Sequence, residues 1–378
     1  MQYDNSNRYN RAFPGWSHNN DGRLSEAAII GILEGEGIGP ELMAVCRLIL
    51  EKAGACIGQR FIFHTGGAIG TPAWRGTGHW VTQEVEDFCR SIHYQGGAVL
   101  CGPGGGRFVY ELRRRLDLFC KLVPLRPLAT LNDIGPICPE ARDGVDILVV
   151  RENLGGLYHG EHSDDSDEGY HRVRHCFHYT QPQVEAILRV GARLAQLRRG
   201  RLCVVYKPGG IPAISGLWQS QAHAICDDMG LTVELLDIDN ACYQIIADAT
   251  RFDVVVASNM FGDVLADSAS VLLGSRGMSF SVNFSEDGFG VYQTGHGSAQ
   301  DIAGKDLANP IGQIQSMILM LREHFDLESL AFGIERAMED VLAARWRTRD
   351  ICGPDCREVG TGRMGELIAE AACQRLME

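Results

Sequence analysis

The sequence has no long hydrophobic run and no excess of positive charge. No apolar segment approaches the roughly 20 residues that a membrane-spanning helix needs, and the N-terminal stretch MQYDNSNRYNRAF lacks the apolar core of a secretory signal. Lys and Arg number 35 against 48 Asp and Glu, a net charge of −13 that disfavours binding to nucleic acid or to an anionic membrane. We therefore expect a cytoplasmic protein with neither kind of partner.

The sequence also lacks a cysteine framework, internal repeats and low-complexity tracts. Its 13 cysteines are odd in number and scattered among apolar segments, as buried thiols in a reducing compartment would be. Cys352 and Cys356 form one close pair, with no second pair to complete a zinc site. A chain of 378 residues, 45% of them hydrophobic, predicts a globular protein of two domains. Residues 1–26 are polar and predict a flexible N-terminal extension.

Short apolar runs separated by helical patterns predict an α/β protein. Several of these runs end at a charged residue, which predicts a site along one edge of the sheet. The runs expected to form buried strands are Ala27–Leu33, Ala98–Cys101, Ile147–Val150, Leu202–Tyr206, Val233–Leu236 and Val254–Ala257.

The stretch FDVVVASNMFGDVLAD, residues 252–267, is the most informative. An apolar run is followed by a helical pattern in which Asp263 and Asp267 are spaced i, i+4, which places both carboxylates on one helix face. Such a pair is most often a solvated helix face. Directly after a buried strand, however, it also suits a divalent cation, because Mg²⁺ and Mn²⁺ prefer carboxylate oxygens.

A glycine-rich turn at residues 35–41, GEGIGPE, follows the first expected strand. Its glycines are spaced G-x-G-x-G and Pro40 follows, so it does not match a dinucleotide-binding fingerprint and indicates only a tight strand-to-helix turn. Further candidate site residues lie on a basic helix, in a turn or at the ends of strands: Arg113, Arg151, Tyr158, Lys207 and Asp239.

Seven segments together resemble the β-decarboxylating dehydrogenases, which act on isopropylmalate, isocitrate, homoisocitrate, or tartrate and D-malate. The resemblance covers residues 28–378. The segments are GEGIGPE (35–41), LRRRLDLF (112–119), VRENLGGLYHGE (150–161), VVYK (204–207), DIDNA (237–241), SNMFGDVLADSAS (258–270) and GHGSAQDIAGKDLANP (295–310).

The resemblance implies two α/β domains of the isopropylmalate/isocitrate dehydrogenase type, unlike a Rossmann fold, with a cleft between them. Residues 27–118 and 274–378 would form a discontinuous cofactor-binding domain. Residues 119–273 would form a central domain with the dimer interface and a dimerisation arm. The implied assembly is a homodimer in which Lys207 and Asp239 reach the active site of the partner.

The implied reaction is a metal-dependent, NAD-linked oxidative decarboxylation of a 3-substituted malate. Asp239, Asp263 and Asp267 would hold Mg²⁺ or Mn²⁺, which acidifies the C2 hydroxyl and polarises the later ketone. Lys207 would be the base, its pKa lowered by neighbouring cations, and Tyr158 the acid that protonates C3. Arg113 and Arg151 would bind carboxylates. The cofactor residues would be His296, Gly297, Ser298, Ala299, Asp301, Ile302 and Asn309, with Asp301 and Ile302 favouring NAD over NADP.

The resemblance also implies that Arg107, Val109 and Tyr110 face the C3 substituent. An arginine there predicts a polar or anionic substituent rather than the isopropyl group of 3-isopropylmalate, because an unpaired arginine against an apolar group is costly. If Arg107 instead grips the malate core, D-malate or tartrate would be the substrate. The alternatives of a 3-isopropylmalate dehydrogenase and of a non-catalytic regulatory homologue stay open.

Three positions depart from the family's pattern. Glu36 stands where an Asp is usual. Pro208, with Gly209 and Gly210, follows Lys207 where the family commonly has an Asn toward the nicotinamide. Val123 occupies the place of a third substrate-binding arginine, for which Arg126 or Arg107 could compensate.

Overall fold

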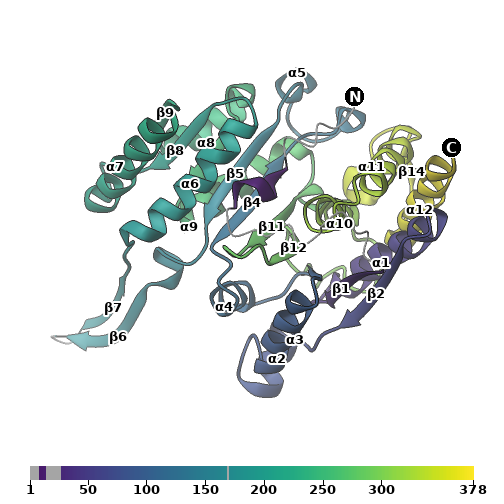
Figure 1. The fold of residues 1–378 in the computed structure, drawn as a ribbon, viewed down its shortest axis with the longest axis horizontal. Helices are drawn as coiled ribbons and strands as arrows, with labels where there is room; N and C mark the ends of the chain where they lie inside the picture. Colours follow the sequence, from purple (N-terminus) through teal and green to yellow (C-terminus); the bar gives the residue numbers. More distant parts are fainter. Residues whose placement is uncertain (1–7, 14–26, 168–169) are drawn as a thin grey trace.

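The computed structural model describes residues 8–13, 27–167 and 170–378. One ten-stranded sheet runs through the molecule (Figure 1), in the order β2-β1-β3-β12-β11-β4-β5-β10-β8-β9. In that order its strands are β2 Arg60–Thr65, β1 Ala27–Leu33, β3 Ala98–Cys101, β12 Gly290–Thr294, β11 Phe280–Phe284, β4 Cys120–Leu125, β5 Ile147–Glu152, β10 Val254–Ala257, β8 Leu202–Tyr206 and β9 Val233–Asp237.

The sheet has two halves that differ in sequence origin. The first half combines strands from residues 27–101 with the hairpin of β11 and β12, and the second half is built entirely from β4, β5, β10, β8 and β9. The antiparallel pairing of β11 with β4 joins the halves. This grouping is compatible with the two predicted domains, whose boundaries stay a prediction.

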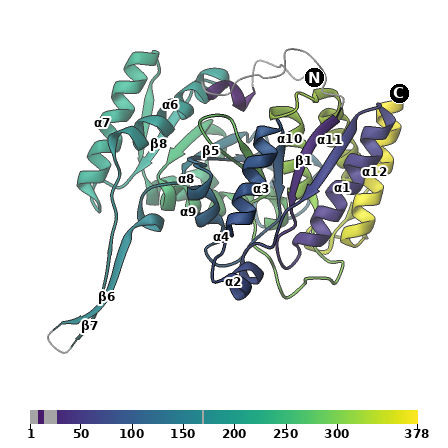
Figure 2. The ribbon, with the colours of Figure 1, turned by 60° about the horizontal axis from the view of Figure 1, so that its bottom comes forward.

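Helices pack around each half of the sheet (Figures 1 and 2). Those of the first half are α1 Gly39–Cys56, α2 Thr71–Thr77, α3 Gln83–Tyr94, α4 Phe108–Arg115, α10 Ile311–Glu323, α11 Glu328–Ala343 and α12 Thr361–Met377. Those of the second half are α5 Pro139–Arg142, α6 Gln181–Leu197, α7 Pro212–Met229, α8 Ile238–Ala247 and α9 Asn259–Ala269. No helix in the described residues is long and apolar enough to cross a membrane.

The strands predicted from short apolar runs are present. Four of the six have the predicted bounds, and β5 and β9 extend beyond theirs to Glu152 and Asp237. β5, β10, β8 and β9 are parallel, so their carboxyl ends lie at one edge of the sheet. Because β4 is antiparallel to β5, its amino end lies at that edge too. The sheet therefore gathers the ends of five strands where the site was predicted.

The segment 8–13 differs from the predicted flexible extension. Tyr9–Ala12 form a 3₁₀ turn whose Asn10 is buried, and the amide N–H of Asn10 donates to the Glu323 carboxylate over 2.9 Å. Phe13 packs against Phe119 and Phe284. The core thus fixes these six residues, and the rest of the predicted extension lies outside the described residues.

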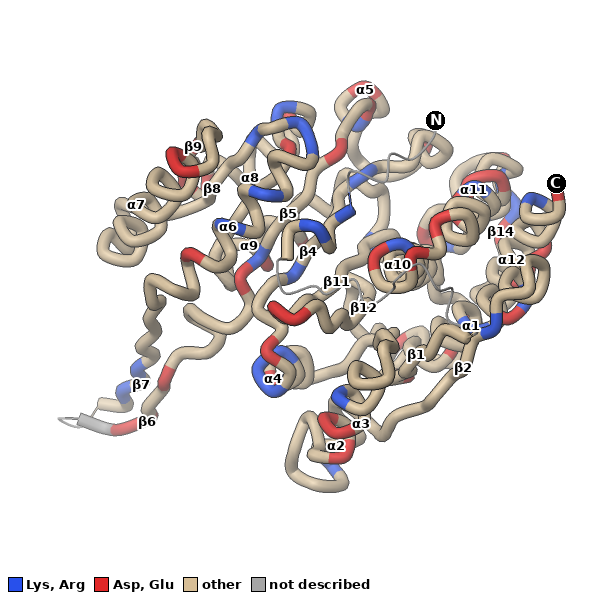
Figure 3. The backbone as a smooth tube through the Cα atoms, viewed as in Figure 1, with Lys and Arg blue, Asp and Glu red and all other residues tan. Residues whose placement is uncertain are grey.

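A two-stranded hairpin, β6 Glu161–Asp167 with β7 Tyr170–Cys176, projects from the body (Figures 1 and 2). β6 carries acidic and β7 basic residues (Figure 3), and Asp165 pairs with Arg174 over 2.5 Å. Two apolar side chains on this hairpin, Tyr170 and Val173, are largely exposed. Asp164 and Asp165 thus lie in a strand of this hairpin. An extended hairpin with exposed apolar residues has the form expected of a dimerisation arm.

Candidate active site

Arg113 is one of the two buried arginines of the site. α4 is short and amphipathic, and it buries Arg113 to 4% exposure on the face that packs toward the sheet. Burial and the nearby Arg151 lower its pKa to about 9. Within the described chain its Nη1 has no hydrogen-bond partner. An anion is the missing partner that such a group calls for.

Arg151 lies at the carboxyl end of β5 and is also buried. Its Nε and Nη2 both donate to Oδ1 of Asn259, over 3.1 and 2.8 Å, and its Nη1 pairs with Asp263. Gly262 makes this packing possible, because a Cβ there would lie only 2.9 Å from Cβ and Cγ of Arg151. The glycine within the SNMFGD stretch therefore lets α9 approach β5 closely enough to hold the guanidinium.

Asp263 and Tyr158 form the next layer. The Tyr158 hydroxyl donates to Oδ2 of Asp263 over 3.1 Å. Burial alone would raise the pKa of Asp263, but Arg151, Lys121 and Arg113 together hold it below its ordinary value, so the carboxylate stays charged. Burial and Asp263 raise the pKa of Tyr158 to about 12, so the phenol keeps its proton. A protonated phenol beside an anion is suited to act as an acid.

Tyr110 and Arg107 extend the cluster outward. The Tyr110 ring lies 5.3 Å from the Tyr158 ring in an edge-on contact, with the guanidinium of Arg107 at 5.5 Å and that of Arg113 at 6.0 Å. Arg107 also donates from Nη2 to the Tyr158 carbonyl over 3.4 Å. Val109 is half-buried at the edge of the α4 core. The structure thus gathers Arg107, Tyr110, Arg113, Arg151, Tyr158 and Asp263.

The remaining predicted metal and base residues do not join this cluster in one chain. Asp267 pairs with Arg276 over 3.1 Å. Lys207 contacts Asp239 over 2.6 Å and Asp237 over 3.2 Å. Hydrogen bonds to these two carboxylates raise the pKa of Lys207, where the sequence led us to expect a lowered one. The reason is that its neighbours within the chain are anions, not the arginine cluster.

The donor set of the chain fits a divalent cation in part. Asp263 and Asp267 lie one turn apart on α9 as predicted, and oxygen ligands of this kind suit Mg²⁺ or Mn²⁺. No group of three potential ligands is close enough to hold a metal within the described residues. Within the described residues, Asp263 and Asp267 therefore lie together, and the third predicted carboxylate, Asp239, lies with Lys207 instead.

The residues predicted to contact the cofactor form a loop against the glycine-rich turn. The amide of Ile38 donates to the Ser298 carbonyl over 2.9 Å, and a Cβ on Gly37, whose φ is +64°, would meet that oxygen at 1.9 Å. Ala299 and Ile302 pack beside Ile38. Nε2 of His296 is shielded without a partner in the described chain. This apolar patch with an unpaired ring nitrogen fits an adenosine group.

Two further cofactor candidates differ in their surroundings. The Asp301 side chain is exposed, as a group that accepts ribose hydroxyls must be. The Asn309 side chain is committed within the protein, since Oδ1 accepts from the Ile311 amide over 3.0 Å and Nδ2 donates to Asp350 over 2.9 Å. The Asn309 side chain therefore shapes the start of α10, and only its backbone is free for a cofactor.

Lys121 is a site residue that our sequence reasoning missed. It lies in β4 directly opposite Arg151 in the strand pairing. Burial, Arg113 and Arg151 lower its pKa to about 7, which shows how close it lies to the arginines. The sequence did contain a signal for Lys121. The resemblance places a third substrate-binding arginine at position 123, and alternate residues of a strand face the same side, so position 121 faces the same way.

Neither Val123 nor Arg126 lies in the cluster. Val123 is 4% exposed and sits opposite Val149 in the apolar core. Arg126 lies just after the carboxyl end of β4, which pairs with the start of β5 and is therefore the end away from the site. Its side chain is exposed, and it lies beside Tyr9 and Asp146. Arg126 therefore does not compensate for the missing arginine, and Arg107 approaches only the outer side of the site.

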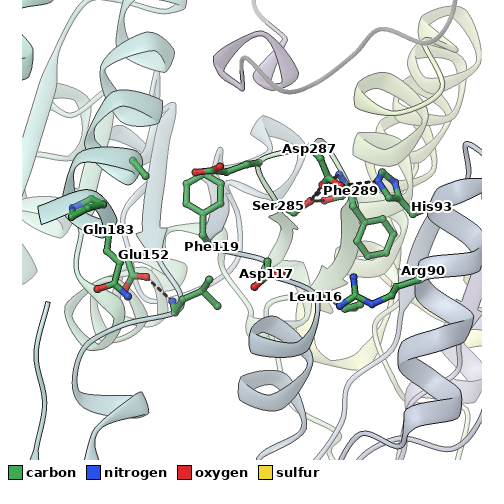
Figure 4. Close-up of a pocket in the computed structure, with 14 residues that line it drawn as sticks. Arg90, His93, Leu116, Asp117, Phe119, Glu152, Gln183, Ser285, Asp287 and Phe289 are labelled. Carbon is green, nitrogen blue, oxygen red and sulfur yellow. Dashed lines mark hydrogen bonds and ion pairs between the residues drawn. The ribbon is translucent and has the colours of Figure 1, made fainter. Parts of the chain in front are cut away.

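A cavity of about 530 Å³ lies apart from this cluster (Figure 4). Glu152, which lines it, follows Arg151 in β5 and so faces the other side of the sheet. Across the cavity from Glu152 and Gln183 lie Asp287 and His93, which pair over 3.1 Å (Figure 4). None of the predicted site residues lines it.

Residues 29–368 match the family model described as isocitrate/isopropylmalate dehydrogenase. The chain belongs to that family. It is 37% identical over 358 residues to the 3-isopropylmalate dehydrogenase of Pseudomonas fluorescens, with 90% of this chain and 97% of that one covered. It is 34% identical over 351 residues to that of a Synechococcus species, covering 90% and 98%.

A solved structure is similar as well. The isocitrate dehydrogenase of Methylococcus capsulatus superposes with a TM-score of 0.80 at 27% identity, covering 93% of this chain and all of the other. The resemblance and the two-domain type of fold expected from the sequence are thereby confirmed. As a family member, the chain is an NAD-dependent decarboxylating dehydrogenase that uses Mg²⁺ or Mn²⁺.

Proposed function

We propose that this enzyme oxidises and decarboxylates a 3-substituted malate whose C3 substituent is polar or anionic. The observation that carries the proposal is the convergence of Arg107, Arg113 and Arg151 around Tyr110 and Tyr158, with one guanidinium nitrogen of Arg113 buried and unpaired. A malate core provides two carboxylates for such a cluster. Arg107, on the outer side, is left for a group beyond C3.

The residues have separate tasks in this reaction. Arg113 and Arg151 orient the substrate through its carboxylates, and burial excludes water from these contacts. When bound, the divalent cation supplies Lewis acidity, and NAD accepts the hydride. Tyr158 holds the proton that C3 receives after CO₂ has left, because its pKa of about 12 keeps the phenol protonated at neutral pH.

We further propose a homodimer in which Lys207 and Asp239 complete the site of the partner. The Asp239 side chain is exposed and that of Lys207 is half-buried, and in the single chain they bind each other rather than Asp263. In the dimer, Asp239 would bind the partner's cation instead of Lys207. Without this carboxylate beside it, the pKa of Lys207 would fall, as a general base requires. The cytoplasm is the proposed compartment, because all 13 cysteines are free thiols.

Mixed dimers test the shared site. Lys207→Ala and Asp263→Asn homodimers should both be inactive. After random subunit exchange, about half of the dimers are mixed, and each mixed dimer has one site with both residues intact. About a quarter of the unmodified activity should therefore return. No recovery, in a mixture shown to contain hybrids, would place Lys207 and Asp263 in the same chain's site.

The substrate has one rival that the comparisons favour. Both relatives named above are 3-isopropylmalate dehydrogenases. Arg107 is exposed, so its charge stays hydrated and an isopropyl group nearby would cost less than it would beside a buried arginine. The rates to compare are kcat/KM for isocitrate, homoisocitrate, D-malate and 3-isopropylmalate with Mn²⁺ and NAD. A preference for 3-isopropylmalate would overturn the proposed polar substituent.

The same assay includes Arg107→Leu. If Arg107 reads the C3 substituent, this variant should lose activity on isocitrate or homoisocitrate and keep it on D-malate. Equal losses on both would mean that Arg107 grips the malate core. Absence of NADH formation from every malate analogue, together with retained binding, would favour the regulatory alternative.

A further inference from the structure

We propose that Lys121 is a substrate-binding residue, the third cation, beside Arg113 and Arg151, that holds the carboxylates of the substrate. The proposal rests on the proposed function and adds one residue to it, because neither Val123 nor Arg126 supplies a third cation to the site. The strand register carries it. Lys121 lies directly opposite Arg151 on one side and Asn283 on the other, at the end of β4 that shares an edge with the carboxyl end of β5.

The charges around Lys121 are not balanced within the chain. Arg113, Lys121 and Arg151 lie together, and Asp263 is already bonded to Arg151 and Tyr158. Lys121 is half-buried, and among the described residues Nη1 of the buried Arg113 has no hydrogen-bond partner. Positive side chains gathered in this way, with one buried guanidinium nitrogen unpaired, create a site that an anion would stabilise.

The neighbouring groups limit what the anion can be. Asn283 Oδ1 accepts from the Asn153 amide over 3.1 Å, and Asn259 Oδ1 accepts from Arg151. Both are uncharged amide oxygens, so neither supplies the negative charge that would balance Lys121. A carboxylate of the substrate would bridge the Lys121 ammonium and the Arg113 guanidinium. Lysine acts there as a point charge without the two-pronged geometry of arginine. It therefore adds affinity for a second negative charge more than it fixes an orientation.

The two other positions considered near this strand do not meet the same description. Val123, two residues further along the same face, is packed in the core, and Arg126 is exposed at the far end. Substitution of Arg126 therefore provides a matched control, since it removes a positive charge near β4 without changing the cluster.

The test compares Lys121→Met, Lys121→Arg and Arg126→Met for binding of D-malate with Mg²⁺ by calorimetry, and for KM and kcat on the best substrate. Lys121→Met should weaken D-malate binding and raise KM about 30-fold or more, with a smaller change in kcat, as expected when a buried charge partner is removed. Lys121→Arg should stay within about 5-fold of the unmodified enzyme, and Arg126→Met within about 2-fold.

Thermal unfolding separates substrate binding from a structural role. Without ligand, Lys121→Met should be at least as stable as the unmodified enzyme, because it removes a positive charge that lies among two arginines. It should also lose most of the stabilisation that D-malate gives. Unchanged D-malate affinity in a folded Lys121→Met enzyme would overturn the proposal, as would loss of folding in Met and Gln variants alike. If the unmodified enzyme turns over no substituted malate, the proposed function is overturned instead. The D-malate binding measurement would then still show whether Lys121 binds the anion.

Discussion

Glu323 provides a sharp test of how the N-terminal segment and the core are coupled. This carboxyl group, at the end of α10, is 5% exposed and accepts the amide N–H of Asn10 over 2.9 Å. Asn10 in turn donates from Nδ2 to the Glu323 carbonyl over 2.9 Å. Burial raises the pKa of Glu323 from its ordinary 4.5 to about 7, although Arg8 and Arg322 counteract part of the effect.

The sign of the pH dependence follows from the raised pKa. Because the folded state binds the proton more tightly than the unfolded state, this group's contribution to stability is complete below pH 4.5 and is lost as the pH rises to 7. The difference between 4.5 and about 7, at about 1.4 kcal/mol per pH unit, corresponds to about 3 kcal/mol. Glu323→Gln keeps an oxygen for the Asn10 amide but never ionises.

Glu323→Gln should therefore match the unmodified protein at pH 5 and exceed its free energy of unfolding by up to about 3 kcal/mol at pH 8. Urea unfolding of both proteins at pH 5, 6, 7 and 8 measures the difference. Glu140→Gln, which changes an exposed carboxylate in α5, should show no such trend. A pH-independent difference, or a Gln variant that is less stable at pH 8, would refute the reasoning.

Three further predictions concern the site. Gly262→Ala should displace Arg151, raise KM about 10-fold and lower the free energy of unfolding by about 1–3 kcal/mol. Gly76→Ala in α2, where nothing lies near the added Cβ, should not lower the free energy of unfolding. The prediction is wrong if the two variants have the same unfolding free energy and the same KM. Tyr158→Phe should slow protonation at C3 more than it slows hydride transfer. The expected observation is a burst of NADH followed by a slow proton-transfer step. Equal slowing of both steps would indicate that Tyr158 has only a packing role. NAD should exceed NADP in kcat/KM by at least about 10-fold, since the Asp301 carboxylate would repel a 2′-phosphate, and Asp301→Asn should narrow that ratio; a preference for NADP would reject the role of Asp301.

The sequence predicted the parts of the fold that local pattern determines. Strands buried on both faces are continuous apolar runs, so β1, β3, β8 and β10 could be bounded from composition alone. Asp263 and Tyr158 were found because motifs of the family mark them. The edge strand β2, RFIFHT, was not predicted, since one exposed face gives it only an alternating pattern.

Contacts between residues far apart in the chain could not be predicted. The fixing of segment 8–13 depends on Asn10 meeting Glu323, 313 residues away. The partners of Lys207 were also missed, because a pocket of cations was assumed around it and the chain supplies Asp237 and Asp239.

The place of Lys121 shows why a missing arginine need not mean a missing charge. Residues 121 and 123 face the same side of β4, separated by about 7 Å along the strand. The position nearer the site edge holds the lysine, opposite Arg151, and the position further in holds a valine that packs against Val149 in the core. Returning an arginine at position 123 would therefore bury a second cation beside the first. If Lys121 binds substrate as proposed, it supplies from the sheet edge the positive charge that an arginine at position 123 would otherwise supply.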